Sequence, residues 1–225
     1  MPVTELVLCT TTSETATPAY RAAITHAMEV QDAWCAAHLP SKPKGGKARG
    51  VGAFQQIGNP AASLLTAHWD SVAQHNLWIA SPENAQVFPL LQTHLDMTRL
   101  VYFHVEGVEA FSDAEEGEGA IPILRAAVVG VTRYAVEAGR KDEFERVWAG
   151  VKDAYHGFVA PYVHKGGWRI EKESEGREEF VLISGWESAE KANALETAEE
   201  LTAFREAIKA VVVETDVKLY TAVEL

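Results

Sequence analysis

The sequence predicts an α+β protein made of two similar units, each with the element order β-α-β-β-α-β. Two observations support this fold class. Short segments recur in the same order in the two halves of the 225-residue chain. Each half also alternates apolar, strand-like runs with longer runs that have helical spacing. This element order is the ferredoxin-like pattern, so the prediction is a tandem pair of ferredoxin-like repeats.

The recurring segments define the two units. Pairs of similar segments are QDAW (31–34) and KDAY (152–155), KGG (44–46) and KGG (165–167), LLTAHWDS (64–71) and VLISGWES (181–188), and VYFHVEG (101–107) and LYTAVEL (219–225). We therefore expect one unit at residues 1–108 and a second at 121–225. Residues 109–120 between them are acidic and poor in apolar side chains, as expected of an exposed linker.

The elements of the first unit follow from local signals. The apolar run ELVLCTT (5–11) predicts a strand, and Thr17 before Pro18 predicts the start of a long helix. Two strand-like runs flank the turn GNP (58–60). A second helix is restarted by Ser81 and Pro82, and a last strand closes the unit.

The second unit repeats this order. It opens on the apolar run 123–134, and its long helix has an apolar stripe at helical spacing: Phe144, Trp148, Val151, Tyr155 and Phe158. Two strand-like runs flank the turn EGR (175–177). One such unit has helices on one face of its sheet, so its other face needs a cover, which a second copy can provide.

Composition excludes several classes of function. A net charge of −12 argues against binding of nucleic acid, which needs a positive surface. No window approaches the roughly 18 apolar residues of a membrane span, and the N-terminus lacks the basic region of a signal peptide. Cys9 and Cys35 fit no metal-binding spacing, so we expect a reduced, cytoplasmic protein.

The segments Trp69-Asp70-Ser71 and Trp186-Glu187-Ser188, together with HNLWIAS (75–81), resemble the dimeric α/β-barrel superfamily. The likeness is to its antibiotic-biosynthesis monooxygenase type. This resemblance implies an α/β barrel of two sheets, which two subunits normally form and which the two halves form here within one chain. A monomeric pseudo-dimer and a homodimer both remain open. It also implies small-molecule pockets between the sheet and the helices of a unit.

The superfamily performs cofactor-free oxygenation of polyketide phenols, polyketide cyclisation, haem degradation and lactone isomerisation, and includes stress proteins without known catalysis. Haem-degrading members carry an axial histidine at a place that falls near Phe88 here, and the first strand offers no asparagine. The resemblance therefore disfavours haem, although His94 keeps it open. No H-x-x-x-H or H-E-x-x-H spacing occurs, so we expect neither a metal nor another cofactor.

Six of the eight histidines lie in the first half, and they supply the candidate catalytic residues. His75 is the best candidate, because it shares a helical face with Val72 and Ile79 and has a ring that titrates near neutrality. The other candidates are His68 at a strand end, His38 near the expected pocket mouth, and His104, which shares a strand face with Tyr102. In the second half, Gly185 and Ala192 stand where His68 and His75 stand in the first.

These residues lead to two functional hypotheses. In the first, a planar aromatic or polyketide-like ligand is held by Trp78, Trp34, Tyr102 and Phe88, and His75 takes a proton from it. The protein is then a cyclase, isomerase, dehydratase or cofactor-free monooxygenase of secondary metabolism, with its working pocket in the first unit and a mainly structural second unit. In the second hypothesis, the histidines are packing residues of a non-catalytic, small-molecule-binding or stress-responsive barrel protein.

Overall fold

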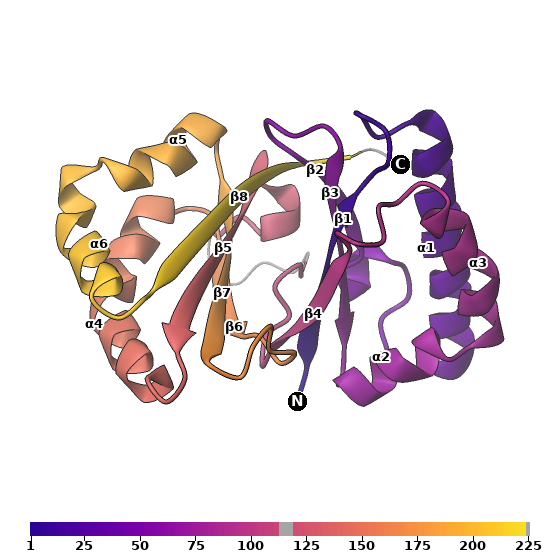
Figure 1. The fold of residues 1–225 in the computed structure, drawn as a ribbon, viewed down its shortest axis with the longest axis horizontal. Helices are drawn as coiled ribbons and strands as arrows, with labels where there is room; N and C mark the ends of the chain where they lie inside the picture. The colour runs from indigo at the N-terminus through magenta and orange to yellow at the C-terminus, as the bar shows by residue number, and fades with distance from the viewer. Residues whose placement is uncertain (113–118, 224–225) are drawn as a thin grey trace. The chain divides into compact units, whose positions relative to one another are not determined.

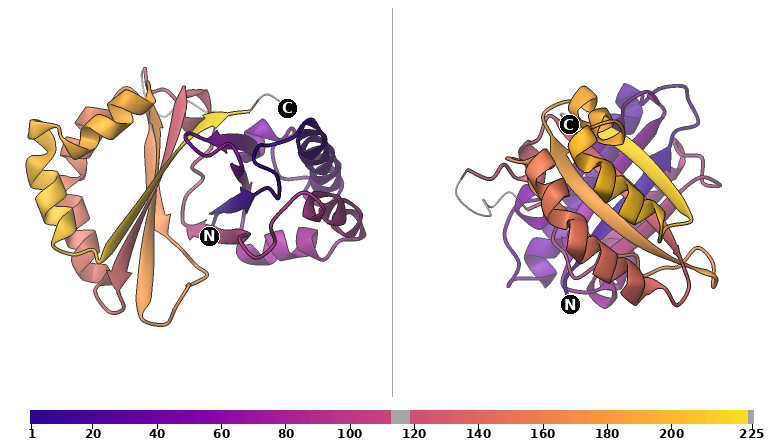
Figure 2. Two further views of the ribbon diagram at one scale, coloured as in Figure 1. Left: turned by 45° about the horizontal axis from the view of Figure 1, so that its top comes forward. Right: turned by 90° about the vertical axis from the view of Figure 1, so that its left-hand side faces the viewer.

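The computed structural model describes residues 1–112 and 119–223. The chain divides into two compact units, one formed by Met1–Asp113 with Tyr220–Leu225 and the other by Ala114–Leu219. In each unit, helices cover one face of an antiparallel sheet (Figures 1 and 2). The α+β fold class and the ferredoxin-like element order of both units are confirmed.

The first unit contains four strands in the order β4-β1-β3-β2. Its elements are β1 (Val3–Thr10), α1 (Pro18–His38), a short 3-10 helix (Lys47–Arg49), β2 (Gly52–Gln56), β3 (Ala62–Trp69), α2 (Val72–Ile79), α3 (Pro82–Gln92) and β4 (Val101–Glu106). The central strands β1 and β3 pair from Val3 opposite Trp69 to Thr10 opposite Ala62. This register places the odd-numbered side chains of both strands beneath the helices.

The second unit has the same strand order, β8-β5-β7-β6. Its elements are β5 (Val128–Glu137), α4 (Lys141–Val159), β6 (His164–Trp168), β7 (Arg177–Trp186), α5 (Ala189–Asn193), α6 (Thr202–Lys209) and β8 (Glu214–Ala222), with 3-10 turns at Ile123–Arg125, Ala194–Glu196 and Glu199–Leu201. The end of β8 belongs to the first unit and pairs with β2, with Ala222 opposite Phe54.

Hydroxyl side chains begin the helices where the sequence predicts it. Thr17 accepts a hydrogen bond from the backbone N–H of Tyr20, and Ser81 accepts one from that of Asn84. Ser71 and Ser188, the serines of the two W-[DE]-S segments, cap α2 and α5 in the same way. Each cap satisfies a backbone donor that would otherwise lack a partner at the first helical turn.

The predicted linker at 109–120 differs from expectation in its first residues. Ala110 and Phe111 are buried, the N–H of Ala110 donates to Thr4 Oγ1 at 3.0 Å, and the ring of Phe111 lies 5.5 Å from that of Phe54. This segment therefore packs against the first unit, because its phenyl ring gains more from burial than from exposure. Residues 113–118 of the predicted linker lie outside the described part of the chain.

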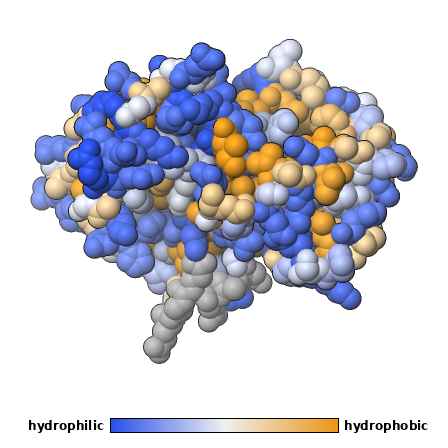
Figure 3. All heavy atoms as spheres, turned by 90° about the horizontal axis from the view of Figure 1, so that it is seen from below, coloured by the Kyte–Doolittle hydropathy of each residue, from blue (hydrophilic) through white to orange (hydrophobic). Residues whose placement is uncertain are grey.

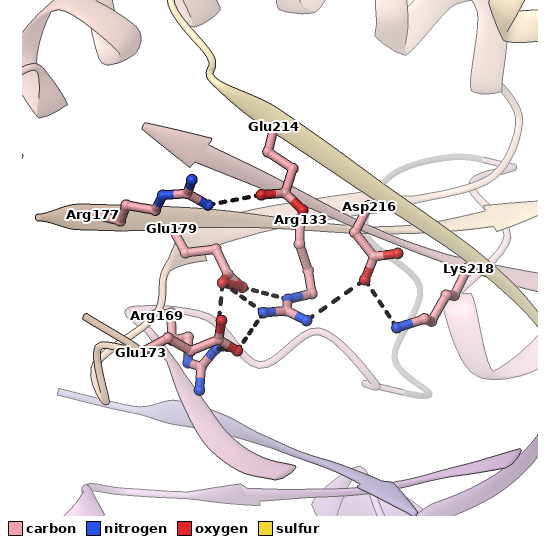
Figure 4. A network of polar contacts seen from close by, with 8 residues as sticks. All are labelled: Arg133, Arg169, Glu173, Arg177, Glu179, Glu214, Asp216 and Lys218. Carbon is pink, nitrogen blue, oxygen red and sulfur yellow. Dashed lines mark hydrogen bonds and ion pairs between the residues drawn. The ribbon is translucent and has the colours of Figure 1, made fainter. Parts of the chain in front are cut away.

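A network of ion pairs links three strands of the second unit (Figure 4). Arg133 of β5 donates to both carboxylate oxygens of Glu179 on β7, at 2.5 and 2.7 Å, and lies 3.5 Å from Asp216 of β8. Arg133 lies between Thr132 and Tyr134, which line a cavity, so it projects from the opposite face of the strand. The network joins neighbouring strands on the face away from the helices.

Candidate functional site

The first unit encloses a cavity of about 290 Å³ between its sheet and its helices. Most of the lining is apolar, with side chains from β1, β3, α1 and α3. Its polar lining groups are Glu5, Gln31, Thr66, His75, Trp78, Asn84 and Tyr102. Trp78, Phe88 and Tyr102, which the sequence suggests as ligand-binding residues, all line this cavity. Apolar walls with a few polar groups are typical of small-molecule sites.

The cavity opens to solvent beside Ile79 and Tyr102. Both side chains line the cavity and are substantially exposed, at 40% and 49%. Apolar side chains also lie among hydrophilic ones on the face of the molecule in Figure 3. An apolar rim lowers the desolvation cost for an aromatic ligand that enters here.

Three buried titratable side chains meet at one wall of the cavity. Glu5 comes from β1, His75 from α2 and His104 from β4, and Glu5 and His104 are opposite each other in the β1–β4 pairing. His75 Nδ1 lies 2.8 Å from His104 Nε2, and His75 Nε2 lies 3.4 Å from Glu5 Oε2. The indole of Trp69 donates to the same Glu5 oxygen at 2.7 Å. These groups form a continuous chain from carboxylate to imidazole to imidazole.

The position of His75 is fixed from several sides. Its ring stacks on Trp69 with the ring centres 4.7 Å apart, and Tyr102 meets it edge-on at 6.4 Å. Burial, helped by the neighbouring His104, lowers the pKa of His75 to about 3. An ionised Glu5 opposes this effect, since a nearby negative charge favours the imidazolium. Burial is the largest effect and the pKa is lowered overall, so the ring is neutral, with one nitrogen a donor and the other an acceptor.

Glu5 was not a candidate from the sequence, although a signal was present. It alternates along β1 with Val3, Val7 and Cys9, so it is a carboxylate within an apolar, inward-facing series. A buried carboxylate at such a position needs partners, and Trp69 and His75 supply them. Glu5, Trp69 and His75 are far apart in the sequence, so only the structure shows that they are in contact.

His68 does not belong to this cluster. It projects from the other face of β3, where its Nε2 accepts a hydrogen bond of 2.9 Å from the backbone N–H of Phe111. Its ring also packs directly over Gly50, where an added Cβ would lie 2.4 Å from Nε2. The expectation that His68 serves catalysis is therefore not supported, since its acceptor nitrogen is used to anchor the segment that follows β4.

His38 and Trp34 also lie outside the cavity lining. His38 is exposed at the end of α1, where its Nδ1 lies 2.9 Å from the carbonyl oxygen of Trp34 and its ring stacks on the indole. Trp34 is buried and packs 5.6 Å from Trp78, which does line the cavity. Trp34 thus packs against Trp78 and does not itself line the cavity.

The anchoring role of His68 predicts a loss of stability in acid. Burial, together with the charge of Lys42, lowers the pKa of His68 from 6.5 to about 4. The unfolded chain therefore binds a proton at higher pH than the folded chain does. Stability contributed by neutral His68 is complete above pH 6.5 and falls as the pH drops towards 4, by about 3 kcal/mol in total.

Urea unfolding at pH 7.5 and at pH 4.5 measures this loss. We expect His68→Gln, whose amide oxygen can still accept from Phe111, to lose about 2 kcal/mol less than the natural protein over this interval. Equal losses in the two proteins would contradict the assignment.

The second unit lacks the titratable cluster. The register of β5 with β7 places Val128 opposite Trp186, as Val3 is opposite Trp69, so Gly130 corresponds to Glu5. Counted from the capping serines Ser71 and Ser188, Ala192 corresponds to His75. The second unit therefore has no counterpart of the Glu5 carboxylate or of the His75 imidazole at these positions.

The second unit nevertheless has a cavity of its own, of about 270 Å³, between its sheet and its helices. The sequence predicts a working pocket in the first unit and a mainly structural second unit, and it does not anticipate this second cavity. Small residues explain the space: Gly130 and Ala192 line this second cavity at the positions where Glu5 and His75 project into the first.

Within residues 1–112 and 119–223, no group of three or more His, Cys, Asp or Glu side chains is arranged to hold a metal ion. None of the helices in these ranges is long and apolar enough to cross a membrane.

Comparison with known proteins places the chain by its fold. No protein-family model and no curated protein sequence matches it. An anthrone oxidase-like protein is similar over 99% of this chain and 92% of its own, with a TM-score of 0.63 and 18% identity. A candidate monooxygenase from Lactobacillus acidophilus is similar over 98% and 93%, with a TM-score of 0.55 and 13% identity. A haem-binding protein from Thermus thermophilus is similar over 100% and 92%, with a TM-score of 0.56 and 10% identity.

The three solved structures match nearly the whole chain, including both units. Their low sequence identities limit the likeness to the fold. The element order, the strand order and these neighbours agree with the resemblance of the W-[DE]-S segments. The chain has a dimeric α/β-barrel fold, with two ferredoxin-like units in a single polypeptide.

Proposed function

We propose that this protein is an enzyme that removes a proton from an aromatic, polyketide-like substrate bound in the cavity of the first unit. The observation that carries the proposal is the hydrogen-bonded series Glu5–His75–His104, whose first two members line a mostly apolar cavity. A buried carboxylate with imidazoles behind it is costly to keep unless it is used or fully paired.

Glu5 is the group best placed to accept the proton. Both nitrogens of His75 already face partners, Glu5 on one side and His104 on the other. The low pKa of His75 also makes its neutral ring a weak base. Glu5 itself lines the cavity, so its carboxylate can reach a C–H group of a bound ligand. We therefore assign proton abstraction to Glu5, with His75 acting through it.

The two histidines position Glu5 for the proton transfer. In the resting state His104 donates to His75 Nδ1, and His75 Nε2–H donates to Glu5, which also accepts from Trp69. These donated bonds hold the Glu5 carboxylate at the wall of the cavity. The proton that Glu5 takes from the substrate stays on the carboxyl group until it is returned to the oxygenated intermediate, which restores the carboxylate.

Oxygenation is the reaction we favour, since an anthrone oxidase-like protein and a candidate monooxygenase share this fold. An anthrone-type ring system has a CH₂ group made acidic by a conjugated carbonyl. Removal of one proton gives a carbanion that reacts with O₂ at this carbon, and loss of water then leaves a second carbonyl. The balance is one CH₂ group and one O₂ converted into one C=O group and one H₂O.

Oxygen consumption with anthrone as the substrate tests the proposal. We expect the protein to consume one O₂ for each anthraquinone formed, at a rate well above that of buffer. Anthrone that binds without turnover would instead support the alternative of a non-catalytic carrier. No binding and no turnover would reject this substrate class.

The role of His75 makes a separate prediction. Replacement of His75 by alanine should lower kcat about 100-fold, because Glu5 loses the donor that positions its carboxylate. The matched control is His26→Ala, which removes an exposed imidazole from α1 and should leave kcat unchanged. Steady-state kinetics of both variants, with matching melting temperatures, test this role, and a fully active His75→Ala enzyme would refute it.

A further inference from the structure

We propose that the cavity of the second unit is a binding site for a small aromatic carboxylate, whose acid group takes the place that the Glu5 carboxylate has in the first unit. The site is separate from the cavity of the proposed reaction. Its lining residues all belong to the second unit. The inference does not depend on the function proposed above.

The indole of Trp186 points to such a ligand. In the first unit the corresponding Trp69 donates its Nε1–H to Glu5 at 2.7 Å. In the second unit Gly130 replaces the glutamate, and a Cβ there would lie 2.6 Å from Trp186 Nε1. Within the described residues Trp186 Nε1–H has no hydrogen-bond acceptor, although the side chain is 3% exposed and lines the cavity. This donor faces the cavity, where an acceptor from a ligand can pair with it.

A second polar group in the same cavity also lacks a partner. Tyr134 is 5% exposed and lines the cavity, and its hydroxyl makes no hydrogen bond to the residues that the structure describes. Burial raises the pKa of Tyr134, so the hydroxyl keeps its proton and remains a donor. The hydroxyl of the neighbouring Tyr155, by contrast, is bonded to Ser184 at 3.0 Å. Two unused donors in one apolar cavity fit an oxygen-rich acceptor.

The charges and walls of the cavity define the rest of the ligand. Its charged lining residues are two cations, Arg205 and Lys209, and one carboxylate, Glu196. Arg205 is held towards the 3-10 turns by bonds to the carbonyl oxygens of Leu195 and Ala198, at 3.0 and 2.6 Å. The aromatic and aliphatic walls include Phe204, Ile208 and Leu219. A flat hydrocarbon body with one carboxylate matches this lining, and the volume of about 270 Å³ suits a two-ring compound.

Calorimetric titration of the whole protein with 2-naphthoate tests the proposal. We expect one molecule to bind per chain, since the Glu5 carboxylate repels an anion from the first cavity. Tyr134→Phe removes one donor without changing the shape of the cavity and should weaken binding about 5- to 10-fold. The matched control is Tyr102→Phe, which removes a hydroxyl from the first cavity and should leave the affinity unchanged.

A second variant makes the test independent of the tyrosine. Ala192→Leu places a larger side chain in the cavity and should abolish binding of 2-naphthoate, while 2-methylnaphthalene, which has no acceptor, should bind natural protein weakly or not at all. Melting curves of each variant confirm that it is folded. No binding to the natural protein at millimolar concentration, or equal affinity in natural, Tyr134→Phe and Ala192→Leu proteins, would overturn the proposal. Failure here would leave turnover of anthrone in the first unit unaffected, so the two proposals are tested apart.

Discussion

Glu5→Gln should lower kcat for anthrone by about 1,000-fold, the largest effect on activity that we expect from a single substitution. Glutamine keeps the length of the side chain and an oxygen that can accept from Trp69, whose donated bond is 2.7 Å long. It loses the negative charge and the basic oxygen that takes the proton. We therefore expect binding and melting temperature to change little while the chemical step is lost.

The control for this variant is Glu29→Gln, which neutralises an exposed carboxylate on α1 that does not line the cavity. It should keep the kcat and KM of the natural protein. If Glu5→Gln retains more than a tenth of the natural kcat with an intact fold, Glu5 is not the base.

Gly50→Ala should produce the largest loss of stability, about 2 to 4 kcal/mol. Gly50 has φ +66°, a left-handed conformation that costs an alanine about 1 kcal/mol or more. Its Cβ would also lie within 2.4 to 2.6 Å of three atoms of the His68 ring. That ring is fixed by the N–H of Phe111, so it cannot move aside cheaply, and overpacking adds a further loss of roughly 1 to 3 kcal/mol.

Gly58→Ala separates the two causes. Gly58 has φ +80° but no atom within 4 Å of an added Cβ, so its substitution measures backbone strain alone, about 1 kcal/mol. Thermal unfolding should show a drop of about 10 °C for Gly50→Ala and only a few degrees for Gly58→Ala. Equal drops for the two variants would show that His68 does not hold the turn at Gly50 in place.

Much of the fold was predictable because short sequence segments determine where its helices begin. Thr17, Ser81 and the serines of the W-[DE]-S segments are caps whose chemistry acts within one helical turn. The recurrence of these segments at the same places in both halves fixed the element order twice. The burial of Phe111 was not predictable, because the segment around it is acidic and its partner, Phe54, is distant in the sequence.

The candidate site was predictable only in part, because strand pairing assembles it. His75 was expected to face inward from its helical spacing and Trp78 to hold a planar ligand, and both side chains line the cavity. The approach of His104 to His75 depends on the β1–β4 register, which also sets Glu5 opposite His104. The side of the sheet on which His68 lies was not predictable. Strand β3 is largely buried on both faces, so its side chains do not alternate between apolar and polar.

Exchange of substrate hydrogen without oxygen tests the proton-abstraction step most directly. Anthrone incubated anaerobically in D₂O with the protein can lose and regain its acidic proton but cannot be oxidised, so NMR detects abstraction alone. We predict that the natural protein incorporates deuterium at the CH₂ carbon far faster than buffer and that Glu5→Gln does not. Deuterium incorporation at the buffer rate with natural protein, or equal acceleration by Glu5→Gln, would contradict the assignment of Glu5 as the base.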